Sequence, residues 1–119
     1  MMPDFVRVAQ LSEIPPGRML AVRLEEEDLV LYNIGGEIFA TRDFCPHAGY
    51  PLSKSHLDGR YVRCSLHSWE FDVRSGEYTG NPNIRLRCFP VRIEGTDVCV
   101  RLEPLAPPRP APPPSRDEA

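Results

Sequence analysis

This 119-residue sequence has no excess of basic residues and no long apolar run. Its 14 basic residues are outnumbered by 17 acidic ones and form no basic patch, which argues against a nucleic-acid binder. No apolar run approaches the ~18 residues of a membrane span, and the start at Met1 lacks the basic and apolar regions of a secretory signal. We therefore expect a cytoplasmic protein with no nucleic-acid and no membrane partner.

The chain is short, and only three histidines are available for chemistry. Seven of the 14 prolines lie between Pro104 and Pro114, so we expect a Pro-rich tail over residues 104–119 in an extended, polyproline-like form. The remaining residues, 1–103, suffice for one small domain. This size excludes a multi-domain enzyme.

The pattern along the domain is typical of β-strands. Short apolar and β-branched runs cover residues 5–8, 19–24, 29–34 and 37–40. Gly35-Gly36 predicts a tight hairpin turn between the last two, and the acidic run 25–28 is interpreted as a solvated hairpin tip. No long helical period is present, and at most a helical turn is expected near residues 53–57. The fold class is therefore all-β with antiparallel strands.

A second hairpin is predicted around a turn at Gly95-Thr96. The register places Ile93 opposite Val98, Val91 opposite Val100, Phe89 opposite Leu102, Cys88 opposite Glu103 and Cys99 opposite Arg92. Cys88 and Cys99 would then be about four residues, or roughly 13 Å, apart along the ladder. A disulfide needs Cα atoms within about 7 Å, so we expect none here.

Two cysteine–histidine pairs lie in the middle of the chain: Cys45-Pro46-His47 and Cys64-Ser65-Leu66-His67. Thiolate and imidazole are ligands for zinc, copper or iron–sulfur centres. Zinc modules usually pair cysteine with cysteine and histidine with histidine, whereas both pairs here are mixed. Mixed pairs suit a two-iron cluster in which one iron takes both thiolates and the other both imidazoles. A structural zinc-binding module remains the alternative.

The segments 43–49 and 64–67 resemble the C-x-H…C-x₂-H signature of Rieske [2Fe–2S] proteins. The stretch 71–77, Phe-Asp-Val-Arg-Ser-Gly-Glu, is similar to the family's F-D-x-R-T-G-x motif. The resemblance implies a Rieske fold of stacked antiparallel sheets with one [2Fe–2S] cluster in a small subdomain at about residues 42–83. It implies that Cys45 and Cys64 hold the inner iron, and that His47 and His67 hold the outer iron near the surface.

Four positions distinguish the chain from respiratory Rieske proteins. Tyr50 and Leu66 stand where those proteins have a disulfide, which fits a reducing cytoplasm. Trp69 and Phe71 stand where those proteins have hydroxyl groups that bond to sulfur, and such bonds stabilise the reduced cluster. We therefore expect a reduction potential at the low end of the Rieske range, about −150 mV.

Further expectations concern the surroundings of the cluster. Ser68 replaces a glycine that is usual in the family, and it either strains the backbone or supplies a hydroxyl. Residues 80–83 form either a plain turn or the loop that covers the cluster. His56 is expected at the surface and not as a ligand. The docking rim is expected to comprise Ala48, Gly49, Pro51, Ser68 and Trp69, although Trp69 could equally pack under the loop.

The function follows from the lack of other chemistry. His56 alone cannot build the two-histidine, one-carboxylate iron site of an oxygenase, and no flavin or nicotinamide fingerprint is present. The resemblance implies a monomeric ferredoxin, not an enzyme, that carries single electrons from a flavin-dependent reductase to a terminal oxygenase of the aromatic-ring type. The alternative is the small Rieske-like subunit of a nitrite reductase or another oxidoreductase complex.

Overall fold

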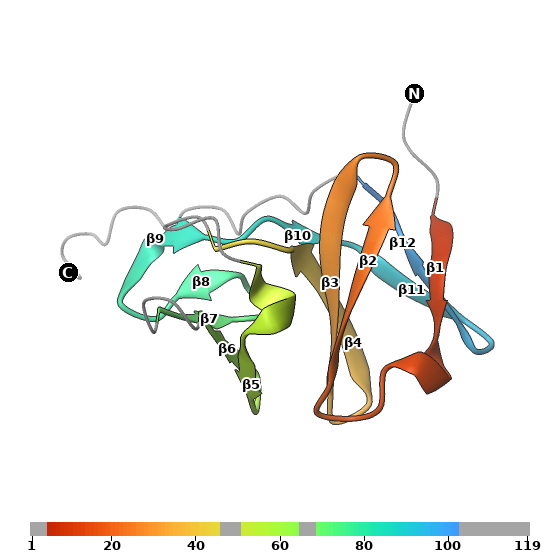
Figure 1. Ribbon diagram of the computed structural model, residues 1–119, viewed down its shortest axis with the longest axis horizontal. Coiled ribbons are helices and arrows are strands. Elements are labelled where there is room, and N and C mark those ends of the chain that lie inside the picture. Colours follow the sequence, from red (N-terminus) through yellow and green to blue (C-terminus); the bar gives the residue numbers. More distant parts are fainter. Residues whose placement is uncertain (1–4, 46–50, 65–68, 103–119) are drawn as a thin grey trace, which may run out of the picture.

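The computed structural model describes residues 5–45, 51–64 and 69–102, which form three antiparallel sheets (Figure 1). The first has the order β1 (Val6–Gln10), β12 (Asp97–Val100), β11 (Val91–Glu94). The second has the order β10 (Cys88–Phe89), β4 (Glu37–Arg42), β3 (Glu27–Ile34), β2 (Met19–Leu24). The third has the order β5 (His56–Asp58), β6 (Tyr61–Arg63), β7 (Glu70–Asp72), β8 (Glu77–Tyr78), β9 (Asn81–Arg85). Two 3₁₀ helices, η1 (Leu11–Glu13) and η2 (Leu52–Lys54), lie between strands.

The β2–β3–β4 sheet is the middle layer, because its two faces line two separate hydrophobic cores. Leu29 and Leu31 of β3 pack into a first core with residues of β1 and β12. Val30 and Tyr32, the alternate residues, pack into a second core with residues of β6 and β7. Side chains alternate across a strand, so a strand buried on both faces has an almost continuous apolar sequence.

The predicted strands agree with the structure where the apolar pattern is long. β2 has the predicted bounds, while β3 begins two residues earlier than predicted and takes in half of the acidic run 25–28. Only Glu25 and Glu26 form the turn itself, and Glu25 has a φ of 58°. The turn at Gly35-Gly36 is confirmed, with φ values of 62° and 100° that favour glycine. The helical turn is η2, one residue earlier than predicted, and it is followed by β5.

The predicted register of the last hairpin is correct from Val91 onward and wrong before it. Val91 pairs with Val100, Ile93 with Val98 and Arg92 with Cys99. Phe89 and Cys88, however, pair with Ala40 and Thr41 of β4 instead of Leu102 and Glu103. Pro90 lies at the change, and its missing N–H prevents a continuous ladder. The chain leaves the middle sheet at this proline and joins the first sheet.

The third sheet runs from His56 to Arg85, so all but its last two residues fall in the predicted subdomain 42–83. Residues 81–83, expected in a turn or a covering loop, instead begin β9, which pairs with β8. Within the described parts of the chain, no helix is long and apolar enough to cross a bilayer. The Pro-rich segment 104–119 lies outside the described residues, and the domain boundary at residue 103 stays a prediction.

Candidate metal centre

The first predicted ligand, Cys45, lies shortly after β4. The carboxylate of Asp43, two residues before it, is bonded to Ser53 on the far side of residues 46–50. Asp43 accepts two hydrogen bonds from Ser53, one from the backbone N–H (2.7 Å) and one from the hydroxyl (2.6 Å). The amide of Asp43 in turn donates to the carbonyl of Asp28 (2.9 Å) at the start of β3. Hydrogen bonds to a charged acceptor are stronger than neutral ones. The end of β4 and the start of η2 are thereby held together on either side of residues 46–50.

The second predicted ligand, Cys64, directly follows the strand β6. Its amide donates to the carbonyl of Trp69 (2.7 Å), directly beyond the last β6–β7 pair, Arg63 with Glu70. The hydrogen bond brings the two ends of segment 64–69 together. The two cysteines are 19 positions apart in the sequence. Each follows a strand and lies next to a short segment whose flanking residues are joined by hydrogen bonds.

The fold brings these two cysteines into one core. Neither Cys45 nor Cys64 forms a disulfide; both have no exposed surface, and both belong to the second core. Their apolar neighbours there include Leu52, Val62 and Phe71. Two cysteines that are not disulfide-bonded and share one apolar core fit the donor chemistry of an iron–sulfur centre, because thiolate sulfur is the ligand that such centres prefer.

Other predicted residues lie outside the described part of the chain. They are His47, Ala48, Gly49, Tyr50, Leu66, His67 and Ser68. Of the remaining ones, His56 is exposed on β5, as predicted, and Pro51 is half-buried before η2.

Trp69, for which two interpretations were open, packs against the second core. Its ring stacks on Tyr78 at a centroid distance of 4.1 Å and an angle of 8°. Phe71 is fully buried beside both rings, with centroids 6.3 Å from Trp69 and 5.6 Å from Tyr78. Gly80 lies against the same stack, since a Cβ built there would be 2.7 Å from the Tyr78 ring. Trp69 is thus part of an aromatic group with Phe71 and Tyr78. The place of Tyr78 in this group was not predicted from the sequence.

The hydroxyl groups of Tyr32 and Thr41 form a buried pair that was not predicted from the sequence. The hydroxyl of Thr41 donates to the carbonyl of Arg42 (2.9 Å), so the hydroxyl of Tyr32 is the donor in its 2.8 Å hydrogen bond to Thr41. Burial raises the pKa of Tyr32, which therefore stays protonated. The bond between Tyr32 and Thr41 ties β3 to the end of β4, and β4 ends three residues before Cys45.

The other two cysteines belong to neither hydrophobic core. Cys88 and Cys99 are free and stand in different sheets, β10 and β12. Burial raises the pKa of the Cys88 thiol to about 11, so it stays protonated near neutral pH.

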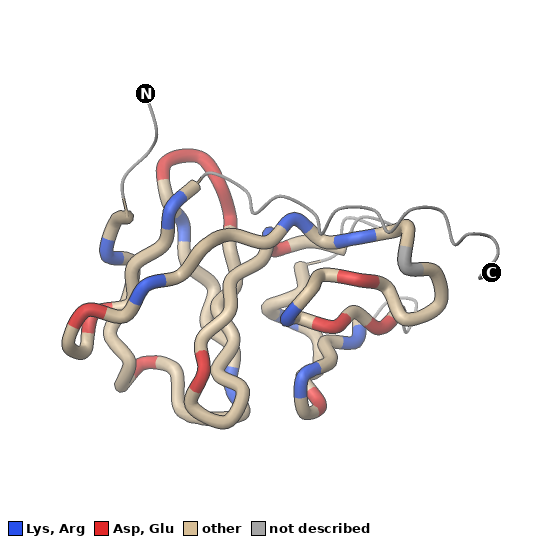
Figure 2. The backbone as a smooth tube through the Cα atoms, turned by 180° about the vertical axis from the view of Figure 1, so that it is seen from behind, with Lys and Arg blue, Asp and Glu red and all other residues tan. Residues whose placement is uncertain are grey.

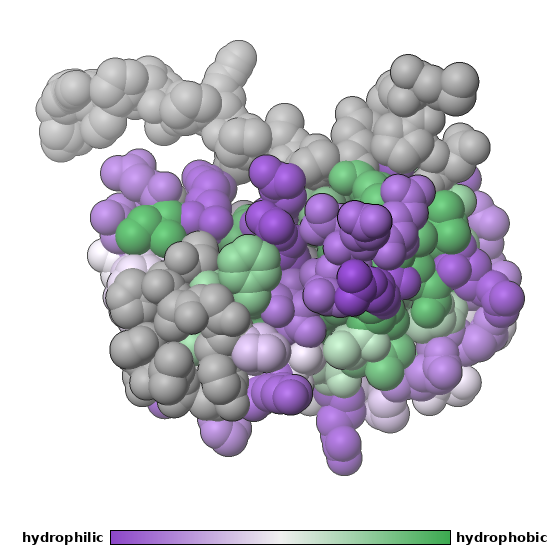
Figure 3. Space-filling view, turned by 45° about the horizontal axis from the view of Figure 1, so that its top comes forward, coloured by the Kyte–Doolittle hydropathy of each residue, from purple (hydrophilic) through white to green (hydrophobic). Residues whose placement is uncertain are grey.

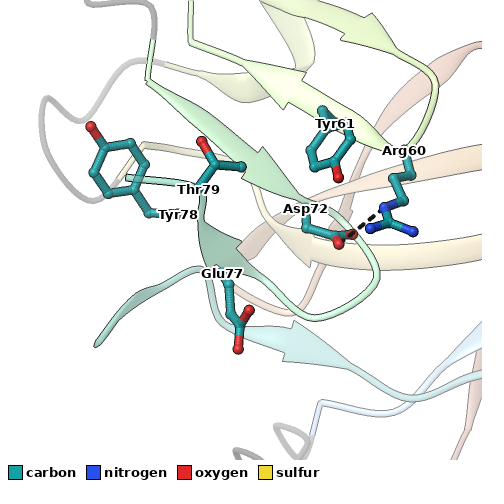
Figure 4. Close-up of a pocket in the computed structure, with 6 residues that line it drawn as sticks. All are labelled: Arg60, Tyr61, Asp72, Glu77, Tyr78 and Thr79. Carbon is teal, nitrogen blue, oxygen red and sulfur yellow. Dashed lines mark ion pairs between the residues drawn. The ribbon is translucent and has the colours of Figure 1, made fainter. Parts of the chain in front are cut away.

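The third sheet also carries a shallow polar pocket of about 320 Å³ (Figure 4). Arg60 lies over the ring of Tyr61 at 5.2 Å and forms a 3.2 Å ion pair with Asp72. Glu77, Tyr78 and Thr79 complete the lining. The charged groups on one side of this pocket already neutralise each other, which leaves little charge to recognise a ligand.

The described residues form an all-β protein of three antiparallel sheets, with two cysteines buried in one core. The family model of the Rieske [2Fe–2S] domain matches residues 4–90, and the chain belongs to this family.

The relatives with similar sequences are ferredoxins. The biphenyl dioxygenase ferredoxin subunit of Pseudomonas sp. (strain KKS102) is 41% identical over 98 residues, covering 81% of this chain and 90% of that protein. The naphthalene 1,2-dioxygenase system ferredoxin component of Pseudomonas aeruginosa is 37% identical over 103 residues, covering 86% and 99%. A chain in the complex of reduced oxygenase and oxidised ferredoxin in carbazole 1,9a-dioxygenase has a TM-score of 0.78 and 30% identity, covering 86% and 96%.

These findings confirm the predicted class. The protein is a Rieske-type ferredoxin with one [2Fe–2S] cluster, and it is an electron-transfer component, not a catalytic subunit.

Proposed function

We propose that this ferredoxin receives electrons from a flavin-dependent reductase and delivers them to the terminal oxygenase of an aromatic-ring dioxygenase system. The support comes from the relatives, whose names are those of ferredoxin components of such systems. It also comes from the similar chain in the oxygenase–ferredoxin complex of carbazole 1,9a-dioxygenase. A [2Fe–2S] cluster, when bound, takes up and releases one electron at a time.

We further propose that Cys45 and Cys64 ligate one iron of the cluster and that His47 and His67 ligate the other. The observation that carries this assignment is the burial of both cysteine side chains in one core, each next to a segment that holds one of the histidines in the sequence. Burial keeps the sulfur ligands away from water, and the hydrogen bonds at Asp43 and Cys64 hold the ends of both segments.

The ligand assignment is tested by replacing His67 and, separately, His56 with alanine. We expect His67→Ala to lose the visible spectrum and the EPR signal of a reduced Rieske cluster, and His56→Ala, at an exposed position on β5, to retain both. An intact Rieske spectrum in His67→Ala would contradict the assignment.

The low reduction potential remains part of the proposal. Phe71 is fully buried and has no hydroxyl, and the indole of Trp69 offers none either. Without hydroxyl donors at these places, the reduced cluster is less stabilised, which supports a midpoint of about −150 mV. Ser68 would be a substitute donor. A redox titration that gave a midpoint above about +100 mV would refute this account of the potential.

The direction of electron flow is tested by reconstitution. The purified ferredoxin should elute as a monomer, should be reduced by a flavoprotein reductase with NADH, and should then support turnover by a terminal dioxygenase. Elution only in a fixed complex with a catalytic subunit would instead favour the alternative of a bound Rieske-like subunit.

A further inference from the structure

Three arginines from distant parts of the sequence meet in a pocket next to Cys45. The pocket has a volume of about 280 Å³ and is lined by Arg42, Phe44, Arg85, Leu86 and Arg87. The amide of Arg42 donates to the carbonyl of Arg87 (2.9 Å), which brings the end of β4 beside the segment between β9 and β10. The expectation of no basic patch is therefore wrong for the folded chain, in which pairing of β4 with β10 assembles one. Figure 2 shows basic positions close together along the stretch from β9 to β10.

The charge of this arginine pocket is only partly neutralised. Arg42 lies 3.7 Å from Glu27, and Arg85 lies 3.0 Å from Glu77 through its Nη2 atom. The other terminal nitrogen of Arg85, Nη1, is buried and has no acceptor among the described residues. Arg87 is exposed and forms no ion pair with any residue that the structure describes. Two of the three guanidinium groups thus have a carboxylate partner, and the charge of Arg87 leaves the pocket residues with a net positive charge.

The carboxylates near the pocket do not remove that charge. Asp43, the acidic residue next along the chain, keeps its charge but is not among the residues that line the pocket, and both of its oxygens accept hydrogen bonds from Ser53. The ring of Phe44 lies 4.6 Å below the guanidinium of Arg42 and keeps that group in place. None of the residues that line the pocket is acidic. A visiting carboxylate would thus meet fixed guanidinium groups, which bind carboxylates through two parallel N–H donors.

The pocket lies close to the two cysteines that we assign to the cluster. Phe44 precedes Cys45, and Leu86 packs in the same core as Cys45 and Cys64. A group bound here is therefore close to the segments that we assign to the cluster. On the described part of the face seen in Figure 3, hydrophilic residues lie among hydrophobic ones. Complementary charges can orient a partner on such a mixed surface.

We propose that the arginine pocket binds a carboxylate side chain of an acidic surface on the redox partner and thereby orients the partner toward the cluster. This inference rests on the proposed function only for the nature of that partner. The attraction is local, because the whole chain has a net charge of −3 and would otherwise repel an acidic surface.

The test uses a fluorescent hexaglutamate peptide and the cluster-loaded full-length protein at low ionic strength. We expect binding by fluorescence anisotropy, and we expect Arg87→Glu to weaken it about fivefold or more, since an attraction is replaced by a repulsion. Arg18→Glu, at an exposed position before β2, changes the net charge equally and should weaken binding less than about twofold. The visible spectrum of both variants should be unchanged.

Three outcomes would overturn the proposal. They are no binding by the wild-type protein, equal weakening in Arg87→Glu and Arg18→Glu, or tighter binding on changing the tail residues Asp117 and Glu118 to Asn and Gln that is absent when Arg87 is also replaced by Glu. The last result would mean that the tail of the same chain occupies the pocket. Neither reductase nor oxygenase is present in this assay, so its failure is separate from a failure of the proposed function.

Discussion

Replacement of Gly76 by alanine should destabilise the part of the protein that holds the cluster. Gly76 has a φ of 83°, where an L-residue costs about 1–2 kcal/mol. A Cβ built there lies 2.5 Å from the carbonyl oxygen of Leu86 and 2.9 Å from the sulfur of Cys88. Carbon–oxygen contacts are normally no closer than about 3.3 Å, so the oxygen must move.

The movement is opposed by hydrogen bonds on both sides of Gly76. The Gly76 carbonyl accepts from the amide of Leu86 (2.7 Å), and its own amide donates to the carbonyl of Asp72 (2.6 Å). Forcing an extra carbon into such a packed site costs about 1–3 kcal/mol in addition to the backbone term. We therefore expect a total destabilisation of about 2–5 kcal/mol.

Gly59→Ala is the matched control, because Gly59 has a φ of 62° but no atom within 4 Å of a built Cβ. It should show the backbone cost alone, about 1–2 kcal/mol. The assay is thermal bleaching of the cluster absorbance at one fixed heating rate, since unfolding that releases the cluster is irreversible. At roughly 4–8 °C per kcal/mol, Gly76→Ala should bleach at least about 4 °C below Gly59→Ala. Equal midpoints would refute the argument from close packing.

Of three more predictions, two use the same bleaching assay and one measures the rate at which an iron chelator removes the cluster. Thr41→Val should cost more than Tyr32→Phe, about 2 against 1 kcal/mol, because only the former leaves a buried tyrosine hydroxyl without its acceptor; the reverse order would contradict the assigned donor. Ser53→Ala removes one hydrogen bond to the Asp43 carboxylate and should speed cluster loss to an iron chelator, whereas an unchanged rate would mean that this bond does not hold the segment. The Cys88 thiol has a pKa of about 11 when folded against 9.0 ordinarily, so its contribution to stability is present below pH 9 and is lost as the pH rises through 11. The bleaching midpoint should therefore fall more steeply between pH 9 and 11 in wild type than in Cys88→Ala, and parallel curves would rule this out.

The sequence predicted the middle sheet best. β2, β3 and β4 are six to eight residues long, and their apolar residues are numerous enough to be recognised without the fold. The strands of the third sheet have two to five residues, and their pairing depends on turns that leave little trace in the pattern. The hairpin register failed at Pro90, where the missing donor should have ended the ladder.

The ligand assignment stays a prediction, because it rests on the resemblance of the cysteine and histidine spacing to the Rieske signature, and both histidines lie outside the described residues. The groups that support the cysteines could not be found in this way. Tyr32 and Thr41 have ordinary apolar and polar neighbours in the sequence, and only the pairing of β3 with β4 brings their hydroxyls to 2.8 Å. The arginine pocket is a similar case, since residue 42 meets residue 87 only through sheet contacts.

The strand β3 links cluster retention to the integrity of the whole domain. Its Leu29 and Leu31 are fully buried in the first core, and its Val30 and Tyr32 are fully buried in the core that contains the cysteines. A disturbance of the second core must therefore shift a strand on which the first core also depends, because closely packed interiors transmit strain. Loss of the cluster and loss of β-sheet circular dichroism should then coincide on heating, in wild type and in Gly76→Ala. Bleaching that is complete before the sheet signal changes would show that the two cores unfold independently.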